Sequence, residues 1–315
     1  MGKKSINWAI SVDKLKVCLN MPEHLFEYFK EHYTQHKGKV RILEEDGFLL
    51  VFTKKEEEED EDKINRISAT LNVRDVEGYF RLGTFDFFNT KRYKNQAFFT
   101  FDNSALYRIY SLNYDKTPNN CICCLLYVME YYGICFNNST EIEIAFDCTC
   151  DFIKKVTNAI KNVDKYQLFI NGKLVEEDET LDGYGEYYTR KRVKLNKNPT
   201  LYFHHKKTTD MQMKIYDKAK ELQEESPHKS KYIHEWLNWD DASEIFRIEV
   251  TWHNNNVREA MKEIGKRREE WGEHENFLNL IGLRDFLTAM IIDGTRRLIY
   301  FKNIKTQEEV SIFEL

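Results

Sequence analysis

Acidic residues lie on two segments whose apolar residues alternate as they do in β-strands. In Glu141–Asp147 the alternation is strict, so Glu143 and Asp147 point to one side of the expected strand. In Glu244–Trp252 the same pattern places Glu249 opposite the apolar side. Carboxylates brought together from two strands make an oxygen site that suits Mg²⁺ or Mn²⁺. These three acids are therefore the candidate metal ligands.

A tyrosine flanked by lysines supplies a candidate nucleophile. Lys214, Tyr216 and Lys218 fall on one side of a third expected strand, which runs into a helix. A tyrosine hydroxyl can attack a phosphodiester and form a covalent link, while neighbouring lysines lower its pKa and hold the phosphate. A bound metal would stabilise the charge that develops in the displacement. The predicted chemistry is metal-assisted cleavage of a phosphodiester.

Alternatives remain open on the same segments. Outward acids on an antiparallel strand also serve solubility, and we favour that role for Glu141. Tyr202 is a rival nucleophile that shares a strand face with His204, itself a candidate ligand or proton acceptor. Tyr202 would otherwise be a strand aromatic that packs on its neighbour.

Basic residues are concentrated in one stretch of the chain. Between Arg190 and Lys218 there are nine, opposed only by Asp210 and Asp217. Phosphate binding needs a local positive field of this kind rather than a basic protein as a whole. The candidates for contact with DNA are Arg190, Lys191, Arg192, Lys194, Lys206, Lys207 and Lys214. A second basic cluster consists of Lys262, Lys266, Arg267 and Arg268. Either cluster alone also fits an ordinary solvated face.

The formal net charge of −5 does not argue against a nucleic-acid partner, because it is unevenly distributed. Seven negative charges fall in the run Glu56–Asp62, which we expect to be a solvated loop. Of the 315 residues, 42% are apolar and 14% aromatic, enough for a substantial core. No stretch approaches the ~18 consecutive apolar residues of a membrane span, so we expect no membrane partner.

The seven cysteines indicate a reduced protein. Their number is odd and they lie within apolar segments, as buried thiols do in cytoplasmic proteins. Only one residue separates Cys148 from Cys150, fewer than the two to four of a structural zinc site, and we favour buried thiols over zinc for both Cys121–Cys124 and Cys148–Cys150. The N-terminus lacks the apolar core of a secretory signal. We therefore expect a cytoplasmic location.

The periodicity predicts an α+β fold with a central antiparallel sheet, helices packed on it and a helical C-terminal region. We expect a catalytic domain over residues 1–253, with its core motifs at 138–252 and the acidic loop at 56–62, followed by helices over 254–315. Further expected strands and helices are a hairpin over Val40–Thr53, helices over Pro22–Tyr33, Asn119–Tyr132 and Asp151–Lys161, and strands over Pro199–Lys206, Met211–Tyr216 and Leu298–Phe301.

The order of these blocks from 138 to 252 resembles the replication-initiation-factor family, the rolling-circle initiators of plasmids and the related relaxases of conjugative elements. The family's acidic strand, Arg-Leu-Asp-Leu-Ala-Phe-Asp, is matched by Glu141–Asp147. Its Lys-Tyr-Phe-Gly strand is matched by Leu201–His204, and its Arg-Ile-Tyr-Asn-Lys-Lys block by Lys214–Ala219. Its Trp-Arg-Val-Glu-Ile strand is matched by Phe246–Val250. Glu141 replaces an Arg, Glu143 an Asp and His204 a Gly.

The resemblance implies an origin-specific DNA nickase. Tyr216 would form a 5′-phosphotyrosine link and release a 3′ hydroxyl that primes synthesis. The residues Glu143, Asp147 and Glu249 would match the family's acidic positions, with Lys218 and Arg247 as phosphate or positioning groups. The expected core is that of the His-x-His nickases without their histidine pair, because none of the nine histidines forms a His-x-His motif. His204 and His205 are adjacent and would point to opposite faces of a strand.

The partners implied are a single-stranded or cruciform nick site in origin DNA, a second copy of the chain and a host helicase. Two other functions stay open. One is a non-catalytic origin-binding protein on a decayed version of the fold, which would bind DNA without a divalent metal. The other is a metal-dependent nuclease that uses water and leaves no protein attached to its product.

Overall fold

The computed structural model describes residues 6–35, 39–43, 46–53, 64–75, 77–108, 119–177, 180–181, 188–189, 200–204, 211–239 and 244–315. The chain forms two compact units. Unit 1 comprises residues 1–12, 143–272 and 283–315, and unit 2 comprises residues 13–142 and 273–282. The division falls inside strands β1 (Trp8–Asn20) and β7 (Cys135–Cys148), so each strand contributes to both units. This division differs from the boundary expected after residue 253.

In unit 1 the sheet order is β12-β13-β14-β7-β1. The first three strands are β12 (Leu201–His204), β13 (Gln212–Asp217) and β14 (Phe246–His253), and their pairings are antiparallel. One face is apolar and buried, and it is formed by Leu201, Phe203, Met213, Ile215, Ile248, Val250 and Trp252. This alternation is the one that the sequence predicts for β13 and β14.

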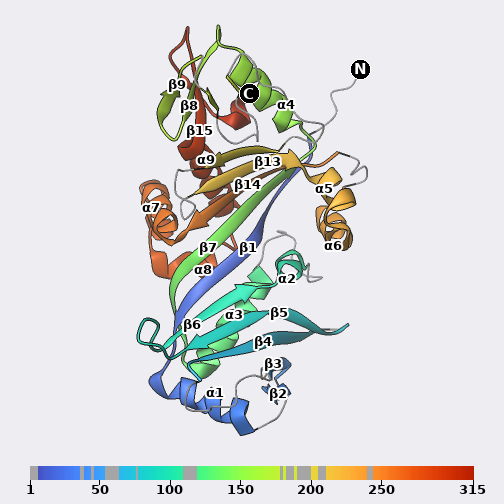
Figure 1. The fold of residues 1–315 in the computed structure, drawn as a ribbon, viewed down its shortest axis with the longest axis vertical. Helices are drawn as coiled ribbons and strands as arrows, with labels where there is room; N and C mark the ends of the chain where they lie inside the picture. Colours follow the sequence, from blue (N-terminus) through green and yellow to red (C-terminus); the bar gives the residue numbers. More distant parts are fainter. Residues whose placement is uncertain are drawn as a thin grey trace. The chain divides into compact units, whose positions relative to one another are not determined.

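Helices of unit 1 contact these strands (Figure 1). They are α4 (Phe152–Lys161), α5 (Lys218–Glu224), α7 (Asn254–Gly265) and α9 (Arg284–Leu298). Asp151 begins α4 and Asp217 begins α5, each accepting a hydrogen bond from the backbone N–H three residues on. Helix α6 (Pro227–Leu237) packs on α5.

A smaller antiparallel sheet in unit 1 has the order β16-β15-β8-β9. Its strands are β8 (Tyr166–Ile170), β9 (Lys173–Val175), β15 (Ile299–Asn303) and β16 (Glu309–Val310). A separate two-stranded ladder joins β10 (Thr180–Leu181) to β11 (Tyr188–Thr189). The short 3₁₀ helices of unit 1 include η3 (Glu269–Trp271) and η5 (Ile312–Glu314).

Unit 2 contains an antiparallel sheet in the order β1-β6-β5-β4-β3-β2. Besides β1, its strands are β2 (Lys39–Ile42), β3 (Phe48–Thr53), β4 (Arg66–Asp75), β5 (Gly78–Phe88) and β6 (Gln96–Phe101). Its helices are α1 (Glu23–Gln35), α2 (Asn103–Tyr107), α3 (Asn119–Tyr132) and α8 (Phe277–Leu280), with η4 (His274–Asn276). Aromatic rings fill its core: Phe29 of α1 packs on Phe52, Phe87 and Tyr132.

The α+β class, with a large antiparallel sheet and packed helices, is confirmed. The predicted helix over Asn119–Tyr132 and the Val40–Thr53 hairpin are present. In the C-terminal segment β15 confirms the strand predicted over Leu298–Phe301, and β16 is a further short strand after it. Kinship with the nickase core stays a prediction. The acidic run Glu56–Asp62 lies outside the described residues. Within the described part of the chain, no helix combines the length and apolarity needed to span a bilayer.

Candidate functional site

The second face of the β12-β13-β14 sheet carries the polar side chains. The strand register pairs Tyr202 with Lys214 and Lys214 with Glu249, and it pairs Tyr216 with Arg247. Side chains of directly paired residues point to the same face of a sheet. The alternate polar residues of the three strands therefore lie together on one polar face. The full row of polar residues on this face is Tyr202, His204, Gln212, Lys214, Tyr216, Arg247, Glu249 and Thr251.

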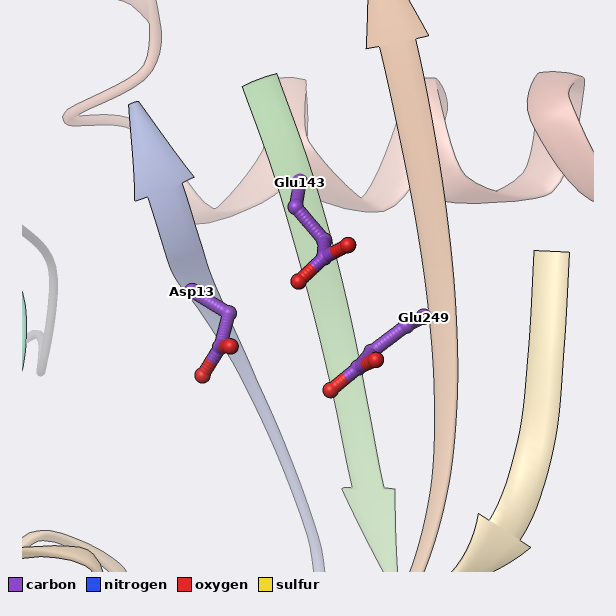
Figure 2. Close-up of side chains that lie close together, drawn as sticks. All are labelled: Asp13, Glu143 and Glu249. Atoms are coloured by element: carbon purple, nitrogen blue, oxygen red, sulfur yellow. The ribbon is translucent and has the colours of Figure 1, made fainter. Parts of the chain in front are cut away.

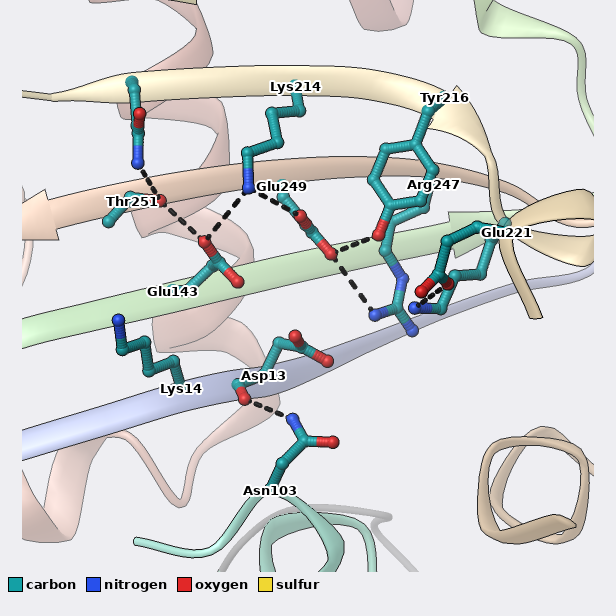
Figure 3. A network of polar contacts seen from close by, with 12 residues as sticks. Asp13, Lys14, Asn103, Glu143, Lys214, Tyr216, Glu221, Arg247, Glu249 and Thr251 are labelled. Atoms are coloured by element: carbon teal, nitrogen blue, oxygen red, sulfur yellow. Dashed lines mark hydrogen bonds and ion pairs between the residues drawn. The ribbon is translucent and has the colours of Figure 1, made fainter. Parts of the chain in front are cut away.

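Tyr216 lies at the end of β13 and its hydroxyl is directed at a carboxylate (Figure 3). The hydroxyl donates a hydrogen bond of 2.5 Å to Oε1 of Glu249. Tyr216 is partly exposed, whereas Glu249 is 5% exposed. Its neighbour Asp217 ends the strand by capping α5, which fixes Tyr216 at the junction between strand and helix. The tyrosine therefore has a carboxylate that can take its proton.

Glu249 is surrounded by cationic groups as well as by the tyrosine. Arg247 Nη1 lies 3.4 Å from its Oε1, and Lys214 Nζ lies 3.7 Å from its Oε2. Lys214 Nζ is also 4.0 Å from Oε2 of Glu143, which accepts a 2.8 Å hydrogen bond from Thr251 Oγ1. The Lys214 ammonium group thus lies between the carboxylates of two predicted metal ligands and offsets part of their negative charge (Figure 3).

Two of the predicted metal ligands in unit 1, Glu143 on β7 and Glu249 on β14, have their carboxylates close together (Figure 2). One oxygen of Glu143 lies within 4.8 Å of one oxygen of Glu249. Oxygen ligands of this kind fit Mg²⁺ or Mn²⁺.

Asp147, the other acid expected to bind the metal, is held by an arginine instead. Arg247 Nε lies 2.7 Å from Asp147 Oδ1, and Arg247 Nη2 lies 2.8 Å from Oδ2. Both side chains are 0% exposed. A bidentate pair of this geometry holds the guanidinium in place while its Nη1 faces Glu249. Asp147 is therefore bound to Arg247, and Arg247 in turn faces Glu249.

Lys218 is buried beside the tyrosine rather than open to solvent. Its Nζ is 2.6 Å from Oε2 of Glu221 and 5.7 Å from the centroid of the Tyr216 ring. Burial by itself raises the pKa of Glu221, but hydrogen bonds and the charge of Lys218 lower it on balance. Lys218 therefore places a positive charge against the Tyr216 ring from an enclosed position.

The rival residues lie on the same sheet face. Tyr202 is 43% exposed on β12 and pairs with Lys214, while His204 pairs with Gln212 and is exposed. The predicted DNA contacts Arg190, Lys191, Arg192, Lys194, Lys206 and Lys207 lie outside the described residues. Of that set, the structure describes Lys214.

Comparison with known proteins assigns no role to these residues. No family model matches the chain, and no curated protein matches it.

Proposed function

We propose that the protein is a metal-dependent DNA nickase in which Tyr216 is the nucleophile. The observation that carries the proposal is the hydrogen bond from the Tyr216 hydroxyl to Glu249, a carboxylate that is itself grouped with Glu143. A tyrosine next to a proton acceptor and a cation site combines the two requirements of this reaction. The resemblance of residues 138–252 to plasmid initiators and relaxases supports the same assignment.

The reaction follows from these positions. Glu249 accepts the Tyr216 proton as the phenolic oxygen attacks a phosphorus of the DNA backbone. The bond from phosphorus to the 3′ oxygen breaks, and that oxygen leaves with the electron pair and takes up a proton. The products are a 5′-phosphotyrosine and a free 3′ hydroxyl. Mg²⁺ or Mn²⁺ held by Glu143 and Glu249 would neutralise charge on the phosphate.

Lys214 is the cation that can meet the phosphate, because its side chain is 32% exposed beside Glu249. Arg247 is fully buried, and it acts as a positioning group that holds Glu249 while Asp147 fixes its guanidinium. Lys218, which is ion-paired with Glu221, places its ammonium group over the tyrosine ring and helps to hold the ring in place. Origin DNA is the proposed partner, with a second copy of the chain and a host helicase as further proposed partners.

The test is a search for a covalent adduct. Labelled single-stranded oligonucleotides that tile the DNA around the gene encoding this chain are incubated with the protein and Mn²⁺, or with chelator, and resolved on a denaturing protein gel. We expect a metal-dependent adduct that Tyr216→Phe abolishes. Tyr202→Phe is the matched control, because it removes a hydroxyl from the same sheet face and should leave the adduct.

Other results assign other functions. An adduct that survives Tyr216→Phe and disappears in Tyr202→Phe would make Tyr202 the nucleophile. Cleavage with no adduct would indicate a water-using nuclease. Binding of the oligonucleotides without cleavage in Mn²⁺ or Mg²⁺ would indicate a non-catalytic origin-binding protein.

A further inference from the structure

A pocket of about 600 Å³ lies in unit 1 between the end of α7, the turn through η3 and one side of α9. This volume falls in the range of sites for small molecules, roughly 300–1,000 Å³. The backbone packs closely where the chain turns, since a Cβ added to Gly265 would lie 2.6 Å from the Cα of Gly272. It is lined in part by the second basic cluster of the sequence, which the nicking reaction does not use.

The charges around the pocket do not cancel. Lys266 pairs with Glu263 at 2.7 Å, Arg268 lies 4.0 Å from Asp285, and Asp293 pairs at 2.7 Å with Arg297, which is not part of the lining. Two further lining residues are arginines, Arg267 and Arg296. No ion pair joins either of these two to another residue that the structure describes. The pocket therefore presents two guanidinium groups for an anion.

Flat and apolar surfaces lie next to these charges. Ile264, Ala289 and Ile292 line the pocket, and Ile292 is 36% exposed. The guanidinium of Arg268 lies 4.3 Å from the centroid of the Trp271 ring, so the ring holds the guanidinium plane in place. A guanidinium supported in this way can stack on a planar ring of a ligand as well as on the tryptophan.

We propose that this pocket binds a nucleotide, with its phosphate on Arg267 and Arg296 and its base against Arg268 and Ile292. Arginine forks bind phosphate oxygens in a bidentate manner. The carboxylates of Glu263 and Asp285 at the same pocket suit the hydroxyl and amino donors of a nucleoside, which an inorganic polyanion lacks. The nucleotide is either free in solution or one unit of a single strand, since both present the same groups.

Binding to the full-length protein tests the proposal. The probes are ethenoadenosine diphosphate and a short fluorescein-labelled oligothymidylate, each followed by fluorescence anisotropy. We expect saturable binding of at least one probe, weakened about tenfold by Arg267→Gln with Arg296→Gln, because two charge-assisted contacts are lost. The matched control is Arg258→Gln with Lys262→Gln, which removes two charges from exposed positions of α7 outside the pocket. It should leave binding unchanged.

A second variant distinguishes a loss of binding at the pocket from a loss caused by general unfolding. Ile292→Glu adds a negative charge at a position that is already exposed on α9, so it should weaken binding without unfolding the helix. Pocket-dependent binding of the diphosphate identifies a free nucleotide, and pocket-dependent binding of the oligonucleotide alone identifies a unit of a strand. The proposal is overturned if neither probe binds saturably, or if the control pair weakens binding as much as the pocket pair. Tyr216→Phe should leave this binding intact, which separates its outcome from that of the nicking assay.

Discussion

At the scale of single residues, the site depends on which acids are available to a cation. One oxygen of Glu143 lies within 4.8 Å of one oxygen of Glu249, whereas both oxygens of Asp147 are bound by Arg247. These arrangements imply different roles for residues that look equivalent in sequence. Two substitutions separate the roles.

Removing a clustered carboxylate should weaken metal binding. We expect Glu143→Gln and Glu249→Gln each to lower the affinity for Mn²⁺ by about tenfold or more, because an oxygen ligand with its charge is lost. Isothermal titration calorimetry of the protein with Mn²⁺ measures the change. Glu141→Gln is the control, since Glu141 is paired with Lys14 at 2.9 Å and is outside the cluster. Equal affinities in all three variants would exclude the proposed ligand set.

Removing the carboxylate of Asp147 should instead destabilise the fold. Asp147→Asn removes the bidentate counter-charge of the fully buried Arg247 and leaves only Glu249 at 3.4 Å, and breaking a buried pair costs about 3–5 kcal/mol. Urea unfolding followed by circular dichroism measures the loss. Asp86→Asn breaks the more exposed pair with Arg66 and should cost less than about 1 kcal/mol. If Asp147→Asn kept its stability and lost Mn²⁺ affinity, Asp147 would be a ligand, as the sequence predicts.

At the scale of helices and strands, α9 packs on the apolar side of β14, and the polar side chains of the candidate site lie on the other side of that strand. Gly294 lies in α9, and a Cβ added there would be 2.6 Å from Cζ2 of Trp252 and 2.7 Å from Cγ1 of Val250. Both of these neighbours are fully buried on the apolar side of β14. Glycine is therefore required by close approach rather than by backbone conformation.

Gly294→Ala should lower stability although alanine favours helices. The helix propensity gain is about 1 kcal/mol, and overpacking in a rigid core costs about 1–3 kcal/mol, so we expect a net loss. The urea midpoint measures it, with Ile292→Ala as a control on the exposed side of the same helix. A stabilised Gly294→Ala protein would mean that α9 can move away from β14.

The sequence allows the strands and faces of this region to be predicted because alternation is a local property. The residues around Glu143, Tyr216 and Glu249 predict that each lies on the polar side of a strand. The pairing of Asp147 with Arg247 depends on the order of strands in the sheet. Strand order is decided by contacts between segments far apart in the chain, which periodicity does not encode. For the same reason the two units could not be predicted, since both β1 and β7 cross the division.

At the scale of the whole molecule, buried thiols lie in both units. Cys121 is in unit 2 and Cys148 in unit 1, and burial raises the pKa of each from 9.0 to about 12. The Cys121 thiol also donates a 2.6 Å hydrogen bond to the carbonyl of Ala105. Cys123 and Cys135 are exposed by contrast. Each unit thus contains a thiol that is kept protonated by the fold.

This arrangement predicts alkaline destabilisation of both units. A raised pKa means that the folded state binds the thiol proton more tightly than the unfolded state, so the associated stability is present below pH 9 and is lost as the pH rises from about 9 to about 12. Each thiol contributes a slope of about 1.4 kcal/mol per pH unit in that window. Urea midpoints measured between pH 8 and pH 10.5 should fall, and Cys121→Ala or Cys148→Ala should flatten the decline whatever its effect at pH 8. Cys123→Ala, at an exposed position, should leave the slope unchanged, and a slope unaltered by any of the three would show that these thiols do not control the alkaline transition.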